Sequence, residues 1–291
     1  MSYKRALIII LIIGFSAALV YFLVTVERTL MQRTAASRPV ALPYHWMGNI
    51  SQAGIAEPSG ITYHPMRRSL FVADDSGSIW EIDATDGALV QSKAVNGRDL
   101  EGITVNPVTG LLYAAVEDEE AILEVDPGTL TVRREFKIAR DFEGAQLLKK
   151  GGMGIEAIVF VPDAKHPEGG TFWVGNQSFS LKPKDEPSVV CEVVVPLRSS
   201  QARKAAGTIV GFYRMDFIDI SGLAYDGRAD CLVLISDTTN LLVELKRDGT
   251  VLHRYLLPGD EQEGVVLDGL GYLYIAQESG EIIKLADRRL R

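Results

Sequence analysis

The pattern of apolar and polar residues divides the chain into two parts. From Ala6 to Val26 the sequence runs for 21 residues without a charged side chain. A helix of that length spans about 30 Å, the thickness of the hydrocarbon core of a bilayer. Beyond residue 40 the pattern changes to short alternating runs separated by Gly, Pro, Asn and Asp, as is typical of β-strands and turns. The sequence therefore predicts one apolar helix followed by an all-β domain.

Three interpretations of the apolar segment compete: a transmembrane anchor, a cleaved signal peptide and a buried core helix. A signal peptide has a shorter apolar stretch, about 7–15 residues, with a small-residue cleavage site close behind it. Here the nearest candidate, Ala35-Ala36-Ser37, lies about ten residues further on. A core helix of a soluble protein is rarely apolar on every face. We expect a stub at residues 1–5, an uncleaved transmembrane anchor at 6–26, a linker at 27–41 and a folded domain at 42–291.

The all-β region contains an internal repeat. Gly60 and Gly102 occupy equivalent positions 42 residues apart, and so do Gly222 and Gly264. Units of about 40–45 residues that hold four short strands are typical of a β-propeller. The openings of the five units read Glu57-Pro-Ser-Gly-Ile, Asp99-Leu-Glu-Gly-Ile, Gly154-Ile-Glu-Ala-Ile, Asp219-Ile-Ser-Gly-Leu and Glu261-Gln-Glu-Gly-Val.

The two ends of the repeat predict how the propeller closes. The fifth unit has three strands, and only residues 286–291 follow them, so its outer strand is missing. Residues 44–50 precede the first unit and belong to none. We expect this segment to supply the missing strand, which leaves no open sheet edge between the first and last blades. The predicted fold is a single propeller of five four-stranded blades; six blades is the alternative, because residues 163–215 carry insertions that could conceal irregular strands.

Charge is distributed unevenly along the chain, whose formal net charge is −8. The first 38 residues hold five basic residues and one acid; removing these from 30 Lys and Arg and 38 Asp and Glu leaves 25 basic and 37 acidic residues, a net charge of −12. An acidic domain argues against nucleic acid as a partner. Basic residues flank both ends of the apolar segment, so the positive-inside rule does not fix its orientation. Because a short stub before a large domain usually translocates that domain, we expect a single-pass protein of the cell (inner) membrane with its propeller on the periplasmic or extracellular side.

Motifs for other chemistry are few. Two cysteines, Cys191 and Cys231, exclude a disulfide scaffold and a four-cysteine zinc site. We expect both to be small buried residues in strands; a disulfide between them is the alternative outside the cytoplasm. The four histidines share no spacing, and the sequence has no Gly-x-Ser-x-Gly elbow, P-loop or Gly-x-Gly-x-x-Gly.

Acidic residues recur where the repeat predicts one mouth of the central channel. Residues just before the innermost strand and just after the second strand meet at that mouth, and nearly every unit supplies acids to both places. The first set holds Glu57, Asp99, Glu101, Glu156, Asp219, Glu261 and Glu263, and the second holds Asp74, Asp75, Glu117, Asn176, Asp237, Gln277 and Glu278.

Like charges at this density raise each other's pKa and destabilise the fold unless a cation offsets them. Calcium takes about 6–8 oxygen ligands from carboxylates and amides, which suits this set. In the alternative interpretation the acids accept backbone N–H bonds at turns or face solvent. The expected Ca²⁺ ligands are Glu57, Glu101, Glu156, Asp219, Glu263, Asp74 and Asn176.

The acidic openings resemble those of SdiA-regulated (YjiK-type) proteins. The resemblance covers residues 42–291 and rests on Glu57-Pro-Ser-Gly-Ile-Thr-Tyr, Asp99-Leu-Glu-Gly-Ile-Thr, Gly154-Ile-Glu-Ala-Ile and Asp260-Glu-Gln-Glu-Gly-Val. It implies a bacterial, membrane-attached propeller that faces outward, and it is compatible with calcium in the channel. Related calcium propellers include lactonases, esterases and phytase-like phosphatases. This chain departs from the SdiA-regulated pattern in its third unit, where Gly154 replaces the first acid of the pair. It departs from the lactonase-type propellers in having Asn176 as the only Asn among the mouth residues.

Two functions of different classes are consistent with these observations. The favoured one is a tethered binding or scaffold module with an unknown protein or small-molecule ligand at the mouth, because no nucleophile or base motif occurs. The alternative is a calcium-dependent hydrolase of lactones, esters or phosphoesters. In that enzyme the metal would act as a Lewis acid, and Glu101 or Glu156 would act as the general base.

Overall fold

The computed structural model describes residues 38–95, 98–117, 119–148, 154–178 and 188–288. The predicted stub, the predicted anchor at 6–26 and most of the predicted linker lie outside these residues. Within the described part of the chain, no helix has the length and apolar character needed to cross a membrane. The described residues form the all-β domain that begins near residue 38.

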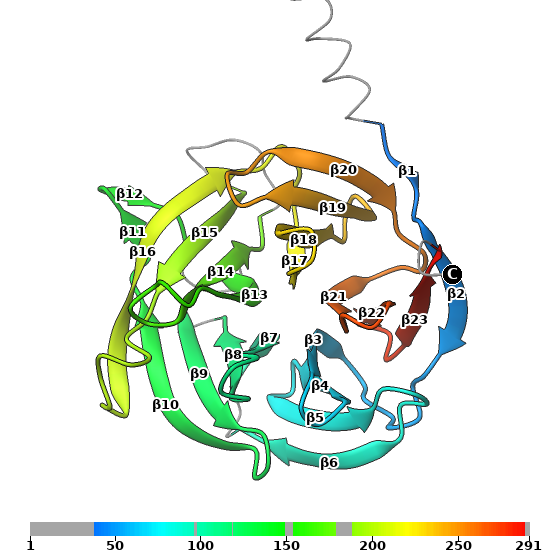
Figure 1. Cartoon of the computed structure of the whole chain (residues 1–291), viewed down its shortest axis with the longest axis horizontal. Coiled ribbons are helices and arrows are strands. Elements are labelled where there is room, and N and C mark those ends of the chain that lie inside the picture. The colour runs from blue at the N-terminus through cyan, green and yellow to red at the C-terminus, as the bar shows by residue number, and fades with distance from the viewer. Residues whose placement is uncertain (1–37, 96–97, 118, 149–153, 179–187, 289–291) are drawn as a thin grey trace, which may run out of the picture.

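The described strands form five blades around a central axis (Figure 1). Blade 1 is β3 (Pro58–His64), β4 (Ser69–Asp74), β5 (Ser78–Asp83) and β6 (Leu89–Ala94); blade 2 is β7 (Leu100–Val105), β8 (Leu112–Val116), β9 (Ala121–Asp126) and β10 (Thr131–Ile138). Blade 3 is β13 (Ile155–Pro162), β14 (Gly170–Asn176), β15 (Val189–Val194) and β16 (Lys204–Arg214); blade 4 is β17 (Ile220–Asp226), β18 (Cys231–Ser236), β19 (Leu241–Lys246) and β20 (Val251–Leu256). Blade 5 is β21 (Gln262–Leu267), β22 (Tyr272–Gln277), β23 (Ile282–Asp287) and β2 (Tyr44–Asn49). The prediction of five blades is confirmed, and the alternative of six is wrong because the described residues of 163–215 hold only strands β14, β15 and β16 of blade 3.

The predicted closure is also confirmed. Strand β2 pairs antiparallel with β23, from Tyr44 opposite Asp287 to Asn49 opposite Ile283. The N-terminal segment therefore supplies the outer strand of the last blade, and the innermost strands β3, β7, β13, β17 and β21 form a closed ring of neighbours.

Short additions extend the outer wall of the propeller. Strand β10 pairs in parallel with β16, which joins blades 2 and 3 into one eight-stranded sheet. Strand β1 (Val40–Ala41) pairs in parallel with β20, and the hairpin of β11 (Asp141–Phe142) and β12 (Ala145–Gln146) lies beside β16. These pairings cover outer sheet edges that would otherwise be open to other chains.

Glycines set the distance between the innermost strands. A Cβ atom on Gly60 would lie 2.6 Å from the carbonyl oxygen of Glu101, and one on Gly264 would lie 2.8 Å from the backbone nitrogen of Ile61. Neighbouring strands therefore touch backbone to backbone at the waist of the channel, where a cavity of only about 10 Å³ remains. That space is at or below the size needed for one water molecule. The equivalent small residues of the five blades are Gly60, Gly102, Ala157, Gly222 and Gly264.

Hydrophobic packing fills the spaces between blades. The buried apolar residues form five clusters, and each cluster draws its members mainly from two adjacent blades. For example, Leu70 of blade 1 and Tyr274 of blade 5 belong to one cluster, so the blades that join the chain ends are held by apolar burial as well as by β2.

Buried glutamates on the third strands of two blades interrupt this apolar packing. Glu81 of β5 accepts hydrogen bonds from Arg67 at 2.7 and 2.8 Å, from Ser69 at 2.6 Å and from Gln91 at 2.7 Å. Glu124 has the equivalent place in β9 and pairs with Arg134. Because a buried charge is destabilising unless it is paired, these contacts explain why the third strands tolerate glutamates.

The cysteines behave as the sequence predicts. Cys191 in β15 and Cys231 in β18 are both buried, and neither is in a disulfide. Burial raises the pKa of the Cys191 thiol to about 12, so it stays protonated and serves as a small apolar residue.

The glycine contacts at the waist predict a large effect of one substitution. Gly60→Val would force apart β3 and β7, because its Cβ meets only backbone atoms that cannot move aside. We expect a loss of about 3 kcal/mol of unfolding free energy, which lowers Tm by roughly 6–12 °C. Thermal unfolding measures this. Gly211→Val on the outer strand β16 is the matched control, since nothing lies within 4 Å of its Cβ position; equal losses in both variants would contradict the argument.

Candidate metal centre

The acids of the repeat converge at the mouth where the innermost strands begin. The backbone nitrogen of Asp75 donates to the carbonyl oxygen of Glu57 at 3.3 Å, and that of Glu117 donates to Asp99 in the same way at 3.4 Å. The same bond joins Asp237 to Asp219 at 3.2 Å and Glu278 to Glu261 at 2.9 Å. The two predicted sets of mouth residues are therefore adjacent in four blades.

A β-bulge at the start of each innermost strand decides which side chains face the channel. In every blade the register shifts just before or at the waist residue. The residue within the bulge is Glu101 in blade 2, Glu156 in blade 3 and Glu263 in blade 5. In blades 1 and 4 it is a serine: Ser59 donates to the backbone of Leu100, and Ser221 donates to the carbonyl oxygen of Gln262 at 2.7 Å. Three glutamates, and not five acids, thus occupy the position nearest the axis.

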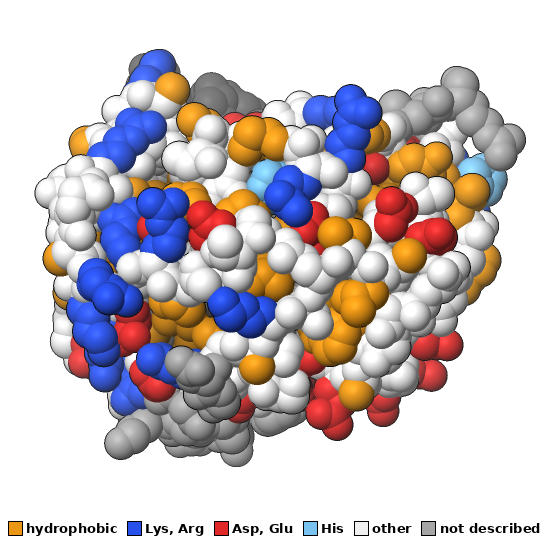
Figure 2. All heavy atoms as spheres, turned by 90° about the horizontal axis from the view of Figure 1, so that it is seen from below, with side chains coloured by type: hydrophobic (Ala, Val, Ile, Leu, Met, Phe, Trp, Pro, Cys, Tyr) orange, Lys and Arg blue, Asp and Glu red, His pale blue; other side chains and the backbone are white. Residues whose placement is uncertain are grey.

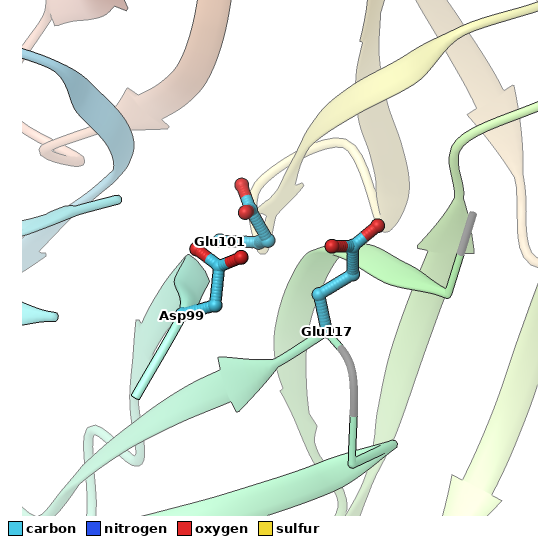
Figure 3. Close-up of side chains that lie close together, drawn as sticks. All are labelled: Asp99, Glu101 and Glu117. Carbon is cyan, nitrogen blue, oxygen red and sulfur yellow. The ribbon is translucent and has the colours of Figure 1, made fainter. Parts of the chain in front are cut away.

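The densest group of carboxylates belongs to blade 2. Oxygen atoms of Asp99, Glu101 and Glu117 all lie within 4.8 Å of one another. Asp99 and Glu101 lie at the start of β7, and Glu117 directly follows the end of β8, so the three side chains lie close together (Figure 3). Glu156 of blade 3 extends the group, because its carboxyl forms a hydrogen bond with that of Glu117.

Burial and mutual repulsion raise the pKa values of these carboxyls. Burial, followed by the charges of Asp75, Asp99 and Glu117, raises the pKa of Glu101 to about 9. Burial and the charges of Asp237 and Asp219 raise the pKa of Glu263 to about 8, and burial with Asp99 raises that of Asp75 to about 6. The pKa of Glu156 is also raised, first by burial and then by Glu101. A site that holds acids in this state stabilises either protons or a cation.

The donor set fits a hard divalent cation. All the converging atoms are carboxylate oxygens, which suit Ca²⁺, whereas Zn²⁺ prefers nitrogen and sulfur. Calcium–oxygen distances of about 2.3–2.6 Å place two ligands on opposite sides of an ion about 5 Å apart, so a span of 4.8 Å is compatible with one ion. Acidic side chains also gather on the outside of the disc, at the lower right edge in Figure 2.

Four of the seven expected ligands have other positions or partners in the structure. Glu57 lies exposed at the rim. Asp219 is buried and accepts hydrogen bonds from the backbone nitrogen and hydroxyl of Thr238, at 3.0 and 2.6 Å. Asp74 accepts from Ser76, Ser78 and Trp80 at 2.6–2.9 Å, and Asn176 accepts from the backbone nitrogen of Val189 at 2.9 Å. Asp74, Asp219 and Asn176 therefore stabilise turns or strand ends, as the alternative interpretation of the sequence allowed.

The other three expected ligands, Glu101, Glu156 and Glu263, face one another's charges at the mouth. The expected ligand set left out Asp75, Asp99 and Glu117, which the structure places beside them. One sequence signal distinguishes the groups: the glutamates near the axis directly precede the small waist residue, as in Glu101-Gly102.

The raised pKa values predict how stability depends on pH in the absence of metal. Glu101, Glu263 and Asp75 hold their protons to higher pH in the folded protein than in the unfolded chain. The folded state then binds more protons from about pH 5 to pH 9, so its stability falls as pH rises through that window. We expect a loss on the order of a few kcal/mol, measured by denaturant unfolding of metal-free protein at several pH values.

Glu101→Gln should flatten this pH dependence, because Gln carries no titrating proton. Glu143→Gln is the control, since Glu143 lies exposed in the β11–β12 hairpin. Stability that is constant or rises between pH 5 and pH 9 would contradict the raised pKa values.

Comparison with solved structures shows the propeller fold. The chain is similar to glutaminyl cyclase from Myxococcus xanthus, with a TM-score of 0.60 and 12% identity over 85% of this chain and 97% of that one. It is less similar to the β-propeller domain of Cps50 (Swd1) from Myceliophteria thermophila, with a TM-score of 0.48 and 10% identity over 84% and 99% of the two chains. A catalytically inactive virginiamycin B lyase from Staphylococcus aureus, with quinupristin, gives a TM-score of 0.43 and 16% identity over 79% and 66%. At 12% identity the likeness to the cyclase supports a shared fold alone and nothing about activity.

Sequence comparison gives the family. No curated protein matches the chain. The family model described as SdiA-regulated matches residues 44–282, from the start of the closing strand β2 to the start of β23. That match covers nearly all of the propeller and most of the chain. The protein therefore belongs to the SdiA-regulated family.

Proposed function

We propose that this protein is a membrane-anchored, extracytoplasmic propeller that binds calcium at the acidic mouth of its channel and serves as a binding or scaffold module. The observation that carries the proposal is the convergence of Asp99, Glu101 and Glu117 within 4.8 Å. The largest charge effects on Glu101 and on its neighbour Glu156 come from other carboxylates. Because the charge effects given for these two groups are all repulsive, a cation would stabilise the group strongly.

The ion would be held chiefly by blade 2, through Asp99, Glu101 and Glu117. Glu156 of blade 3 is the fourth candidate ligand, because its carboxyl already contacts Glu117. A ligand set drawn from two blades would tie their innermost strands together at the mouth. The bound ion would supply positive charge and open coordination positions to a ligand that carries oxygen atoms. This is the property expected of a rigid recognition surface.

One observation favours the hydrolase as a second candidate. Glu101 has a pKa of about 9 and therefore holds its proton at neutral pH, while it forms a hydrogen bond with Asp99. A protonated acid beside a second carboxyl is an arrangement used for proton transfer to and from a reacting group. The substrates that the acidic mouth disfavours least are small neutral lactones or esters.

The proposed anchoring rests on the sequence of residues 6–26 and on the position of the domain that follows. The uncharged segment is long enough to cross a bilayer. Strand β1, the first strand that pairs with the propeller, begins at Val40, so 13 residues separate it from the end of the segment at Val26. This length lets the propeller stand clear of the membrane surface.

Calcium should stabilise the folded protein. At about 100 times its Kd the ion contributes about 2.7 kcal/mol, which raises Tm by roughly 5–10 °C above that of chelator-treated protein. Calorimetric titration of the metal-free protein measures the affinity directly. Glu101→Gln should weaken binding about tenfold or more, because it removes a charged ligand, whereas Glu143→Gln should leave the affinity unchanged.

Absence of calcium binding, with an unchanged Tm, would overturn the proposed metal site. The calcium-loaded protein also separates the two candidate functions. Turnover of a lactone or aryl-ester panel that disappears in Glu156→Gln would assign the hydrolase, and an inactive protein that still binds calcium supports the binding module.

The orientation has its own test. A periplasmic-active reporter fused after Arg291 should be active, and a cytoplasm-active reporter at the same place should be silent, because the whole propeller is expected to be translocated. Fusions after residue 5 serve as the reciprocal control. An active cytoplasmic reporter after Arg291 would place the acidic mouth in the wrong compartment for the proposed function.

A further inference from the structure

A second cavity lies at the end of the channel opposite the acidic mouth. Its volume is about 270 Å³, and it is lined by residues from the far ends of the innermost strands and the loops that follow them. Every innermost strand contributes, for example through Tyr63 of β3, Val105 of β7 and Phe160 of β13. The cavity therefore lies on the axis of the propeller and is shared by all five blades.

The waist separates this cavity from the carboxylates. The space between the two ends is the cavity of about 10 Å³ that Gly60, Gly102 and Gly264 line. No ligand larger than water passes through such a constriction. The two ends of the channel are thus separate compartments with different chemistry.

The lining of the second cavity is mainly apolar. Isoleucine, valine, leucine, phenylalanine and proline side chains make up most of it, and the hydroxyl-bearing residues Thr62, Thr104, Tyr63 and Tyr225 add a few polar groups. Among the described lining residues, none is Lys, Arg or His, and the one charged residue is Asp268. Ligand pockets typically combine an apolar lining with a small number of polar groups in this way.

Asp268 is already engaged by the backbone. Its Oδ1 atom accepts hydrogen bonds from the nitrogens of Leu270, Gly271 and Tyr272, at 2.7, 2.9 and 2.9 Å. Through this oxygen it stabilises the loop between β21 and β22. Burial and then the charge of Asp268 raise the pKa of Tyr63, whereas the charge of Arg68 lowers it, and Asp268 also interacts with the charge of Lys284, so charges of both signs lie behind the apolar lining.

The loops that surround the cavity also carry exposed apolar side chains. Met66, Val108 and Leu270 follow the innermost strands of blades 1, 2 and 5, and they are 61%, 70% and 68% exposed. Their loops also supply Pro65, Pro107 and Gly269 to the cavity lining. An apolar entrance beside an apolar cavity favours the capture of apolar molecules from water.

From these observations we propose that the second cavity is a binding site for a small, uncharged and largely apolar molecule. The apolar lining excludes strongly hydrated ligands, anions among them. Thr104 already accepts from the backbone nitrogen of Phe160 and Tyr225 donates to Asp230, so the hydroxyl groups of Thr62 and Tyr63 are the ones that can orient one or two polar atoms. At about 270 Å³ the cavity suits a compact ligand, since typical ligand pockets hold about 300–1,000 Å³. This site is independent of the proposed calcium site.

The neutral dye N-phenyl-1-naphthylamine is a suitable probe, because its fluorescence rises in apolar surroundings. The full-length protein should bind it saturably, and an anionic naphthalene sulfonate of similar size should bind about tenfold more weakly or not at all. Binding should be the same in calcium and in chelator, because the waist separates the compartments. Loss of calcium binding would therefore leave this proposal standing, and loss of dye binding would leave the calcium proposal standing.

A steric variant places the dye in the cavity. Gly227 lines the entrance, and a Cβ added there would meet only the ring of Tyr225 at an ordinary 3.6 Å. Gly227→Leu should weaken dye binding about tenfold or more without lowering Tm, and Gly227→Ala should give a smaller loss. Gly211→Leu on β16, with nothing within 4 Å of its Cβ position, is the matched control and should bind as the wild type does.

The possible results decide the proposal. No saturable dye binding, or binding that is unchanged in Gly227→Leu, would overturn it, as would equal loss in the Gly211→Leu control. If Gly227→Leu does not fold, Gly227→Ala still gives the test, because its contact with Tyr225 needs no rearrangement.

Discussion

Backbone-to-backbone contact at the waist of the channel is the constraint on which this propeller depends. Five innermost strands can surround one axis this closely only if each carries a residue with little or no side chain at the point of contact. Four glycines and Ala157 meet that requirement, and the Cβ positions of Gly60 and Gly264 lie within 3 Å of neighbouring backbone atoms. The closing strand β2 then joins a ring whose radius the waist has already fixed.

The same constraint gives the two ends of the channel different properties. A bulge at the waist turns the preceding residue toward the mouth, and in three blades that residue is a glutamate. Beyond the waist the strands diverge and present apolar side chains to the second cavity. The waist leaves space for at most about one water molecule. Water that solvates the carboxylates at the mouth therefore does not pass through the waist into the apolar cavity. A narrow propeller of this kind can hold a polar site and an apolar site about one axis without contact between them.

The acidic mouth is electrostatically unfavourable, and the structure shows two ways in which acids there are accommodated. Both oxygens of Asp74 and one oxygen of Asp219 accept hydrogen bonds from nearby groups at turns. Among the described residues no such backbone donor is found for Glu101, Glu156 or Glu263, and their raised pKa values indicate that they hold protons. Acids of the second kind are the ones available to a cation, so hydrogen bonding to the backbone separates structural carboxylates from candidate ligands.

The sequence by itself determined the propeller fold, the closing strand and the end of the channel at which acids gather, and it favoured five blades over six, because strand periodicity and a 42-residue repeat are properties of linear order. It did not determine which acids converge. Glu57 and Asp99 hold the same position in their repeat units, three residues before Gly60 and Gly102, yet Glu57 is at the exposed rim and Asp99 lies beside Glu101 and Glu117. The partner Glu101 comes from the one-residue bulge of blade 2, where blade 1 has Ser59, and a bulge moves a side chain from one face of a strand to another. The apolar cavity was likewise invisible in the sequence, since its lining comes from five separate strand ends that only the closed ring brings together.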